Sequence, residues 1–308
     1  MCGVAGFFTN KYNLDHLKKM TTTLAHRGPD ADGFYFDEQS GIGLGHRRLS
    51  ILDLSSEANQ PFYSNCQRYV MVLNGEIYNY KEIANELGTK SKFIPKTSSD
   101  TEVVIEAFCQ WGVDFVNKLN GMFSIAIWDK QTEDLLLFRD RIGIKPLYYY
   151  SEDCNFAFAS ELKAIIELVE KKNLTTDVNS VFNFLNLGYT AGESSIFNEI
   201  KKLPSGSYLK ITKDKVIEIQ CYWDIKTKVT KELIDDEVIA KKELKNKITA
   251  AVEKRLVSDV PLGTFLSGGI DSSLVSAVAQ DISEQPIDTF CIGFEENKFD
   301  ESTYAKKV

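Results

Sequence analysis

The pattern of apolar residues changes late in the chain, and this change most constrains the fold. Between residues 34 and 160 the sequence reads mostly as short apolar strands separated by turn residues. PLGTFL (261–266) and IDTFCIGF (287–294) are instead apolar strands on either side of a loop, SGGIDSS, and a helical segment, LVSAVAQ. Strand, loop, helix and strand in this order predict a βαβ unit. We therefore expect two domains of different class: an α+β domain of antiparallel sheets, then the start of an α/β domain with a parallel sheet.

We place the first domain at residues 2–215, a linker at 216–235 and the second domain at 236–308. The run KTKVTKELIDDEV (226–238) reads as an exposed linker that runs into a helix. YVMVL (69–73) runs into Asn74-Gly75, a dipeptide that predicts a hairpin turn. Strand pairs are expected for FSIAIWD with DLLLFRD and for PLYYY with FAFAS, and a single strand for residues 3–9. Helices are expected at residues 13–24, 100–111, 162–187 and 240–252.

Composition excludes several classes of function. The formal net charge of −8 argues against nucleic acid as a partner, because a phosphate-binding surface needs an excess of basic residues. No apolar run approaches the roughly 18 residues of a membrane span, and we see no signal peptide, so we expect a cytoplasmic protein. The six cysteines form no CxxC pair, the three histidines form no zinc motif, and no GxSxG is present. A hydrolase of this composition needs a base other than histidine.

Cys2 offers such a base. If Met1 is removed, Cys2 carries a thiol and a free α-amine on the same residue. The unperturbed α-amine has a pKa near ~8 and the thiol near ~8.5, so the amine can deprotonate the thiol directly or through a water. This is the arrangement of an N-terminal nucleophile. The alternative is a cysteine without a function at a frayed terminus.

The SGGIDSS loop predicts a phosphate site. Glycines at a strand-to-helix junction allow an anion to approach backbone N–H groups at the positive end of the helix dipole. Asp271 would repel that anion unless Mg²⁺ lay between them, so we expect a Mg²⁺ contact at Asp271. The loop lacks the lysine of a Walker A motif, which favours pyrophosphate and adenylate chemistry over γ-phosphate transfer. The alternative is a turn that binds nothing.

The sequence strongly resembles the glutamine-hydrolysing asparagine synthetases. The resemblance rests on motifs that follow in order along the whole chain: MCGVAGFF, LAHRGPDADG, GHRRLSILDLS, NGEIYNY, TSSDTEV, LNGMFSIAIWD, RDRIGIKPLYY, FASELKAI, IKKLPSGSYL, YWD and SGGIDSSLVSA. It implies an N-terminal nucleophile hydrolase, an αββα sandwich of antiparallel sheets, followed by an ATP-pyrophosphatase-type domain. Ammonia released from glutamine in the first domain would attack aspartyl-adenylate in the second.

The resemblance also implies roles for individual residues. Cys2 would be the nucleophile, and Asn74 with the Gly75 N–H would form the oxyanion hole. Arg48 would bind the α-carboxylate of glutamine with its bidentate fork, and Glu76 and Asp100 its ammonium group. The remaining glutamine-binding residues would be Leu49, Ser50, Ile51 and Leu52. HRGPD (26–30) would be a structural loop near Cys2. ATP would contact Leu266, Ser267, Gly268, Gly269, Asp271, Ser272, Ser273 and Ile292.

ATP and Mg²⁺ are thus the expected cofactors of the synthetase half, and none is expected for the glutaminase half. Expected partners are glutamine, ATP and aspartate, with no nucleic acid or membrane, and a homodimer is left open. FDESTYAKKV resembles a stretch well inside the synthetase domain, so we expect these 308 residues alone to carry only the glutaminase half-reaction. Two alternatives stay open: an amidotransferase acting on another carboxylate, such as a sugar acid or a peptide-like metabolite, and a non-catalytic glutamine-binding remnant.

Overall fold

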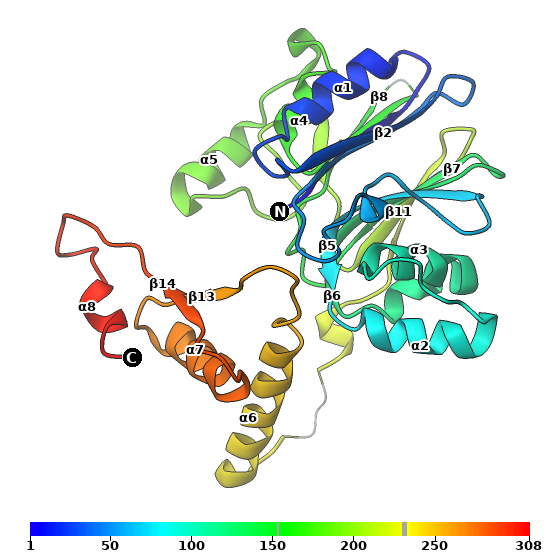
Figure 1. Ribbon diagram of the computed structural model, residues 1–308. Helices are drawn as coiled ribbons and strands as arrows, with labels where there is room; N and C mark the ends of the chain where they lie inside the picture. Colours follow the sequence, from blue (N-terminus) through cyan, green and yellow to red (C-terminus); the bar gives the residue numbers. More distant parts are fainter. Residues whose placement is uncertain (153, 230–232) are drawn as a thin grey trace. The chain divides into compact units, whose positions relative to one another are not determined.

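The computed structural model describes residues 1–152, 154–229 and 233–308. These residues form two compact units, Met1–Lys228 and Val229–Val308, which are described separately below (Figure 1). Part of the predicted linker, residues 230–232, lies outside the described residues. Residues 217–221, also within the predicted linker range, form a strand of the first unit.

Two six-stranded sheets form the centre of the first unit, and all neighbouring strands in both are antiparallel. The strand order of the first sheet is β10 (Ile200–Lys202), β8 (Tyr148–Glu152), β9 (Asn155–Ala159), β1 (Gly3–Phe8), β3 (Ile42–Arg48) and β2 (Ala31–Asp37). The order of the second sheet is β12 (Ile217–Cys221), β11 (Ser207–Ile211), β7 (Asp134–Arg139), β6 (Gly121–Asp129), β5 (Tyr69–Ile77) and β4 (Phe62–Tyr63).

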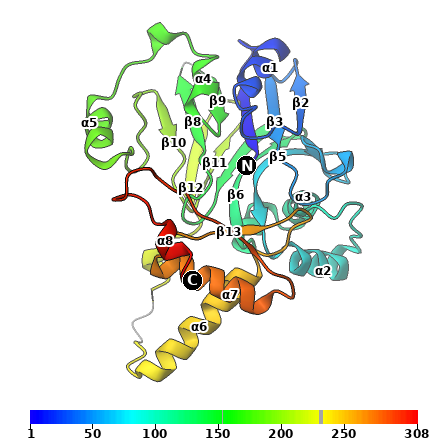
Figure 2. The ribbon, with the colours of Figure 1, turned by 60° about the vertical axis from the view of Figure 1, so that its left-hand side comes forward.

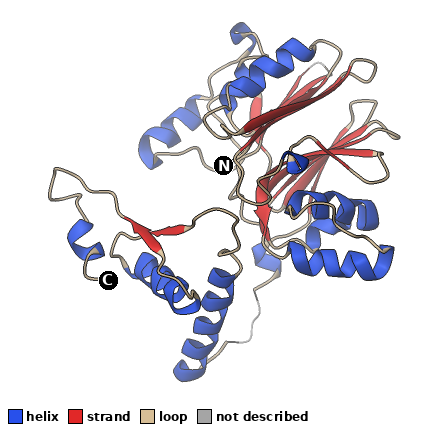
Figure 3. Ribbon diagram, viewed as in Figure 1, coloured by secondary structure: helices blue, strands red, loops and turns tan. Residues whose placement is uncertain are grey.

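The two sheets stack face to face, and helices cover their outer faces (Figure 3). The layer between the sheets is apolar and includes Val4, Leu44, Val72 and Trp128. A second apolar cluster joins the first sheet to α1 (Leu14–Thr22) and α4 (Leu162–Ile166), and a third joins the second sheet to α2 (Tyr80–Ser91) and α3 (Asp100–Trp111). The predicted αββα sandwich is confirmed.

The described residues of the first unit also form four short 3₁₀ helices and one further α-helix. They are η1 (Ser56–Ala58), η2 (Gly112–Asn117), η3 (Lys171–Asn173), η4 (Ile225–Thr227) and α5 (Val178–Leu187).

Two local predictions in the first unit are wrong. Asn74-Gly75 is not a turn, because β5 continues through it and pairs Asn74 with Ser124 and Gly75 with Phe123 on β6. The helix predicted over 162–187 is interrupted between α4 and α5. Thr176 there forms a β-bridge with Phe197, and Asp177 caps α5 by accepting a hydrogen bond from the Asn179 N–H. The predicted pairings of β6 with β7 and of β8 with β9 are confirmed.

The second unit contains the predicted βαβ unit, whose three elements are labelled in Figure 1; its first strand and its helix are also seen in Figure 2. Strand β13 (Gly263–Phe265) and strand β14 (Asp288–Phe290) are parallel, and α7 (Ile270–Ile282) connects them. The unit also contains α6 (Glu237–Glu253) and the short α8 (Ser302–Ala305). Within the described ranges, no helix of either unit has the length and apolar character needed to cross a membrane.

Candidate active site

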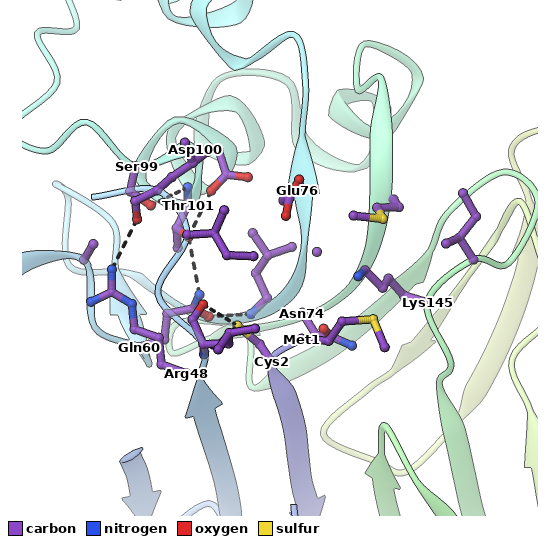
Figure 4. A pocket seen from close by; sticks show the side chains of 18 residues that line it. Met1, Cys2, Arg48, Gln60, Asn74, Glu76, Ser99, Asp100, Thr101 and Lys145 are labelled. Carbon is purple, nitrogen blue, oxygen red and sulfur yellow. Dashed lines mark hydrogen bonds between the residues drawn. The ribbon is translucent and has the colours of Figure 1, made fainter. Parts of the chain in front are cut away.

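Several residues that line a pocket around Cys2 continue the alternation of the inter-sheet core. In β3, Ile42 and Leu44 face the other sheet, and His46 and Arg48 follow at the same spacing of two. In β5, Val70 and Val72 belong to the same core, and Asn74 and Glu76 follow. Cys2 precedes Val4 in the same way. One end of the apolar layer therefore becomes polar, and Cys2, Arg48, Asn74 and Glu76 all line the pocket there (Figure 4).

Cys2 lies against the backbone of Leu49. The Leu49 N–H donates to Cys2 Sγ at 3.4 Å, and Sγ lies 3.6 Å from the Leu49 carbonyl oxygen. Burial raises the pKa of the Cys2 thiol, while its contact with the Leu49 backbone lowers it. Arg27 fixes the Cys2 backbone: its Nε donates to the Cys2 carbonyl at 2.9 Å, and its Nη1 contacts Glu161 at 2.9 Å. HRGPD is thus a loop beside Cys2, as the sequence predicted.

Asn74 and Gly75 face the pocket from a strand. The Asn74 side chain is fully buried, and its Nδ2 lies 3.5 Å from Ser124 Oγ, while its Oδ1 has no partner among the described residues. His46 supports this strand: its Nε2 lies 3.1 Å from the Leu73 carbonyl, and burial lowers its pKa to about 3, so that the ring is neutral and donates. A Cβ on Gly75 would lie 2.2 Å from the Met122 carbonyl oxygen, so only glycine fits here.

Arg48 is buried, and most of its guanidinium is already engaged. Nη1 donates to the Ser55 carbonyl and to Asn59 Oδ1, each at 2.7 Å, and Nη2 donates to the Leu52 and Asp53 carbonyls. Four of its five N–H donors therefore hold the loop that follows β3, and the bidentate fork is not free in this structure. Of the loop residues predicted to bind glutamine, Leu49, Ile51 and Leu52 line the pocket. Ser50 does not, and its N–H donates to Asp30 Oδ2 at 2.7 Å.

Two carboxyl groups, Glu76 and Asp100, form the acidic side of the pocket. Asp100 is the first residue of α3, follows the capping residue Ser99, and is only 5% exposed. Its Oδ2 accepts a hydrogen bond from the Ile77 N–H at 2.8 Å. Burial raises the pKa of Asp100 to about 6, with a further contribution from Glu76. Burial also raises the pKa of Glu76. Lys145 lowers the pKa of Glu76, but neither carboxyl group forms a salt bridge among the described residues. A cationic ligand would therefore favour the ionised form of both groups.

Sequence reasoning missed four polar residues of this pocket: Gln60, Ser99, Thr101 and Lys145. Gln60 connects β5 to α3: its Oε1 accepts from the Leu73 N–H at 2.6 Å, and its Nε2 donates to Thr101 Oγ1 at 3.3 Å. No pattern in the sequence singles out Gln60. Lys145 lies in RDRIGIKPLYY, a motif that contributed to the resemblance without being given a role.

The SGGIDSS loop joins β13 to α7, as predicted. Gly268 has a φ of +83°, and Gly269 caps the N-terminus of α7. Ser267 Oγ and Ser272 Oγ lie 2.9 Å apart, and Ser273 Oγ is buried without a partner among the described residues. The Leu266 N–H donates to the Phe290 carbonyl, which joins β13 to β14. This turn, helix start and unpaired hydroxyl fit an anion such as a phosphate group.

The remaining predicted ATP-site residues are less enclosed. Asp271 and Ile292 are both exposed, and Ile292 follows β14. Across the described ranges, no three acidic, histidine or cysteine side chains gather in a metal-binding cluster, at Asp271 or elsewhere.

Comparison with known proteins agrees with this arrangement. A family model described as "Glutamine amidotransferase domain" matches residues 1–223. The chain belongs to this family. A second model, described as "Asparagine synthase", matches residues 243–308.

Two curated relatives come from Bacillus subtilis (strain 168), and each is named asparagine synthetase [glutamine-hydrolyzing]. The relative named asparagine synthetase [glutamine-hydrolyzing] 1 is 36% identical to this chain, and the match covers 100% of this chain and 48% of the relative. The relative numbered 3 is 35% identical, and the match covers 96% of this chain and 49% of that relative. The chain therefore spans about half the length of these relatives.

A solved structure of similar fold is the glutamine phosphoribosylpyrophosphate amidotransferase of B. subtilis. It matches with a TM-score of 0.53 and 16% identity, over 100% of this chain and 70% of that chain. At this identity the likeness concerns the fold, and it confirms the predicted N-terminal nucleophile hydrolase fold of the first unit.

Proposed function

We propose that the first unit hydrolyses glutamine to glutamate and ammonia at Cys2. The observation that carries this proposal is the meeting, in one pocket, of a cysteine nucleophile, the Asn74-Gly75 segment and two buried carboxyl groups. These residues come from β5, from α3 and from the residue just before β1, so their convergence is a property of the fold. A non-catalytic binding remnant would have no need of the nucleophile and the oxyanion donors together.

In the proposed reaction, Cys2 Sγ attacks the side-chain amide carbon of glutamine. The new S–C bond places a negative charge on the amide oxygen, which the Asn74 amide and the Gly75 N–H stabilise. Collapse of this intermediate breaks the C–N bond, and the nitrogen leaves as ammonia after taking a proton. Water then hydrolyses the thioester and restores the thiol. Removal of one oxyanion donor from a hydrolase typically costs ~10²–10³ in kcat.

The base of this reaction is the α-amine of Cys2 after removal of Met1. Met1 lines the same pocket, so its removal places the new amine beside the sulfur. Burial lowers the pKa of the amine at the N-terminus of the present chain. The same burial would favour the neutral form of the Cys2 amine, which can accept the thiol proton.

Glutamine is oriented by its own charges. Its ammonium group would pair with Glu76 and Asp100, whose carboxyl groups form no salt bridge among the described residues. Arg48 is the proposed partner of the α-carboxylate. Since its terminal nitrogens hold the loop after β3, we propose that Nε contacts the carboxylate directly or that glutamine displaces a loop carbonyl.

For the whole protein we propose ATP-dependent synthesis of asparagine from aspartate in the cytoplasm. The relatives' names and the match to the asparagine synthase model support this proposal. Gly268, Gly269 and the hydroxyls of Ser267, Ser272 and Ser273 would hold phosphate groups of ATP, with Asp271 near the Mg²⁺. The metal would neutralise phosphate charge when bound. Leu266 and Ile292 would contact the base.

The test is glutamate release from glutamine by the 308-residue chain, with Cys2→Ala beside Cys66→Ala as a matched control. Cys66 is exposed and does not line the pocket. We expect Cys2→Ala to abolish hydrolysis and Cys66→Ala to leave it unchanged, with both variants folded by circular dichroism. Hydrolysis that survives in Cys2→Ala would refute the proposal.

A further inference from the structure

Lys145 is the cation of the glutaminase pocket that no predicted role accounts for. It lines the pocket with Cys2 and Glu76 and is 3% exposed. Among the described residues its ammonium makes no salt bridge and no hydrogen bond. Figure 4 shows its nitrogen directed into the cavity between Glu76 and Cys2. A buried charge is costly unless anionic groups offset it, and Glu76 and Cys2 are the pocket groups that favour the charged form of Lys145.

Asp140 and Arg139 fix the backbone around Lys145 through hydrogen bonds. Asp140 accepts hydrogen bonds from the Ile144 and Lys145 N–H groups, each at 2.9 Å. Arg139 Nε donates to the Lys145 carbonyl at 3.0 Å, and its Nη2 donates to the Gly143 carbonyl at 3.0 Å. Both oxygens of Asp140 thus accept hydrogen bonds from backbone N–H groups and none from the Lys145 ammonium. The Lys145 side chain extends into the cavity instead.

We propose that Lys145 is a positioning residue that holds a fixed positive charge beside Cys2 and favours the thiolate form of its sulfur. This inference rests on the proposed glutaminase function and assigns a role within its site. Lys145 acts through Cys2, because the charge it complements is the one that appears on sulfur before the attack. A positive charge close to a thiol favours its ionised form, as in other reactive cysteines.

Several charged groups affect the pKa values of Cys2 and Lys145, and the test must separate the effect of Lys145 from theirs. Cys2 is influenced by Asp100, Lys145 and the terminal amine, and burial is the largest effect on its pKa. Lys145 is influenced by Glu76, Cys2, Arg27 and Asp140, and burial lowers its pKa. Asp100 raises the pKa of Cys2 and so opposes the thiolate, whereas Lys145 and the terminal amine lower that pKa.

The experiment measures alkylation of Cys2 by iodoacetamide as a function of pH, without glutamine. The rate is read on the Cys2 peptide by mass spectrometry, because Cys66, Cys154, Cys221 and Cys291 are exposed and also react. Three variants of the full chain are compared with the unmodified one: Lys145→Met, Lys145→Arg and Lys202→Met. Lys202 is a matched control, since burial also lowers its pKa, but its Nζ donates to the Thr190 carbonyl and it does not line this pocket.

We expect Lys145→Met to move the alkylation midpoint of Cys2 upward by about one pH unit, the lower end of the effect of a nearby charge. Lys145→Arg should restore most of the difference, and Lys202→Met should have no effect. In glutamine hydrolysis, Lys145→Met should lower kcat about tenfold with little change in KM. If Lys145→Met does not fold, Lys145→Gln takes its place.

An unchanged alkylation midpoint in the folded Lys145→Met chain would overturn the inference. A large rise in KM with an unchanged midpoint would also overturn it and would indicate that Lys145 binds the substrate. Because alkylation needs no glutamine, a chain that shows the midpoint shift but hydrolyses no glutamine would refute the proposed function and leave the role of Lys145 intact.

Discussion

Replacement of Asp100 by asparagine should stabilise the fold at neutral pH and weaken the binding of glutamine. Burial raises the pKa of Asp100 from 3.8 to about 6, so the folded state favours the neutral carboxyl. A difference of about 2 pH units corresponds to about 3 kcal/mol, since one unit is about 1.4 kcal/mol. The amide of asparagine has the shape of the neutral acid, and its oxygen keeps the bond from the Ile77 N–H.

The sign of the pH dependence follows from the raised pKa. Below pH 3.8 the carboxyl is neutral in both states, and Asp100 contributes no difference. Between pH 3.8 and 6 the unfolded chain ionises first, so stability falls as pH rises. Above pH 6 the full cost of about 3 kcal/mol is present. The stability advantage of Asp100→Asn should therefore appear across this window and remain constant above it.

The assay is urea unfolding of both proteins at a series of pH values from 4 to 8, with the difference in unfolding free energy taken at each pH. The difference is needed because His46 titrates in an overlapping window with the opposite sign: burial lowers its pKa to about 3, so its contribution is lost as pH falls below 6.5. Asp114→Asn, an exposed carboxylate outside the pocket, serves as control.

Asp100→Asn should weaken glutamine binding although it stabilises the fold. Without the Asp100 charge the ammonium group of glutamine loses one partner, and KM should rise at least tenfold. A variant that is less stable than the parent at pH 7, with a free-energy difference that does not vary between pH 4 and 6, would refute the reasoning. So would an unchanged KM.

Four further outcomes are expected. Active protein should lack Met1 by intact mass, and active protein that uniformly retains Met1 would exclude the Cys2 amine as base. Arg48→Ala should lower the free energy of unfolding in urea by about 1–3 kcal/mol, because it leaves loop carbonyls without donors, and it should raise the KM for glutamine. An unchanged rate of proteolysis at residues 49–59 would contradict the role of Arg48 in the loop. Gly75→Ala should destabilise the fold by at least 1–3 kcal/mol in the same assay, whereas Gly88→Ala, in the interior of α2, should stabilise it by about 0.5–1 kcal/mol. Finally, the 308-residue chain with aspartate, ATP, Mg²⁺ and glutamine should release glutamate without asparagine or pyrophosphate, and stoichiometric asparagine would disprove this.

Much of the fold could be predicted because strand alternation and the βαβ order are local patterns. The β6–β7 and β8–β9 pairs and the parallel β13–β14 pair follow from such patterns. Cys2 could be proposed as a nucleophile from chemistry alone, since its position gives it a base. These predictions need no knowledge of which distant segments meet.

The errors arose where tertiary contacts override local preference. Asn74-Gly75 has the composition of a turn, yet it forms part of a strand because β6 pairs with it and the Met122 carbonyl leaves no room for a side chain at Gly75. From the sequence, the guanidinium of Arg48 could be assigned to a substrate. The four acceptors in the loop after β3 that bind this guanidinium could not be predicted. Lys145 could not be placed, because its loop is oriented by Asp140 and Arg139.

The alternation of β3 and β5 explains how one pocket is both rigid and polar. Residues 42, 44, 70 and 72 hold the sheets together, and the next residues of the same register carry the proposed chemistry. A slip of β5 by one residue would turn the side chains of Asn74 and Glu76 away from Cys2 and toward α3. The fully buried core residues on both faces of β5 oppose such a slip. The packing that stabilises the sandwich therefore also fixes which side chains face the nucleophile.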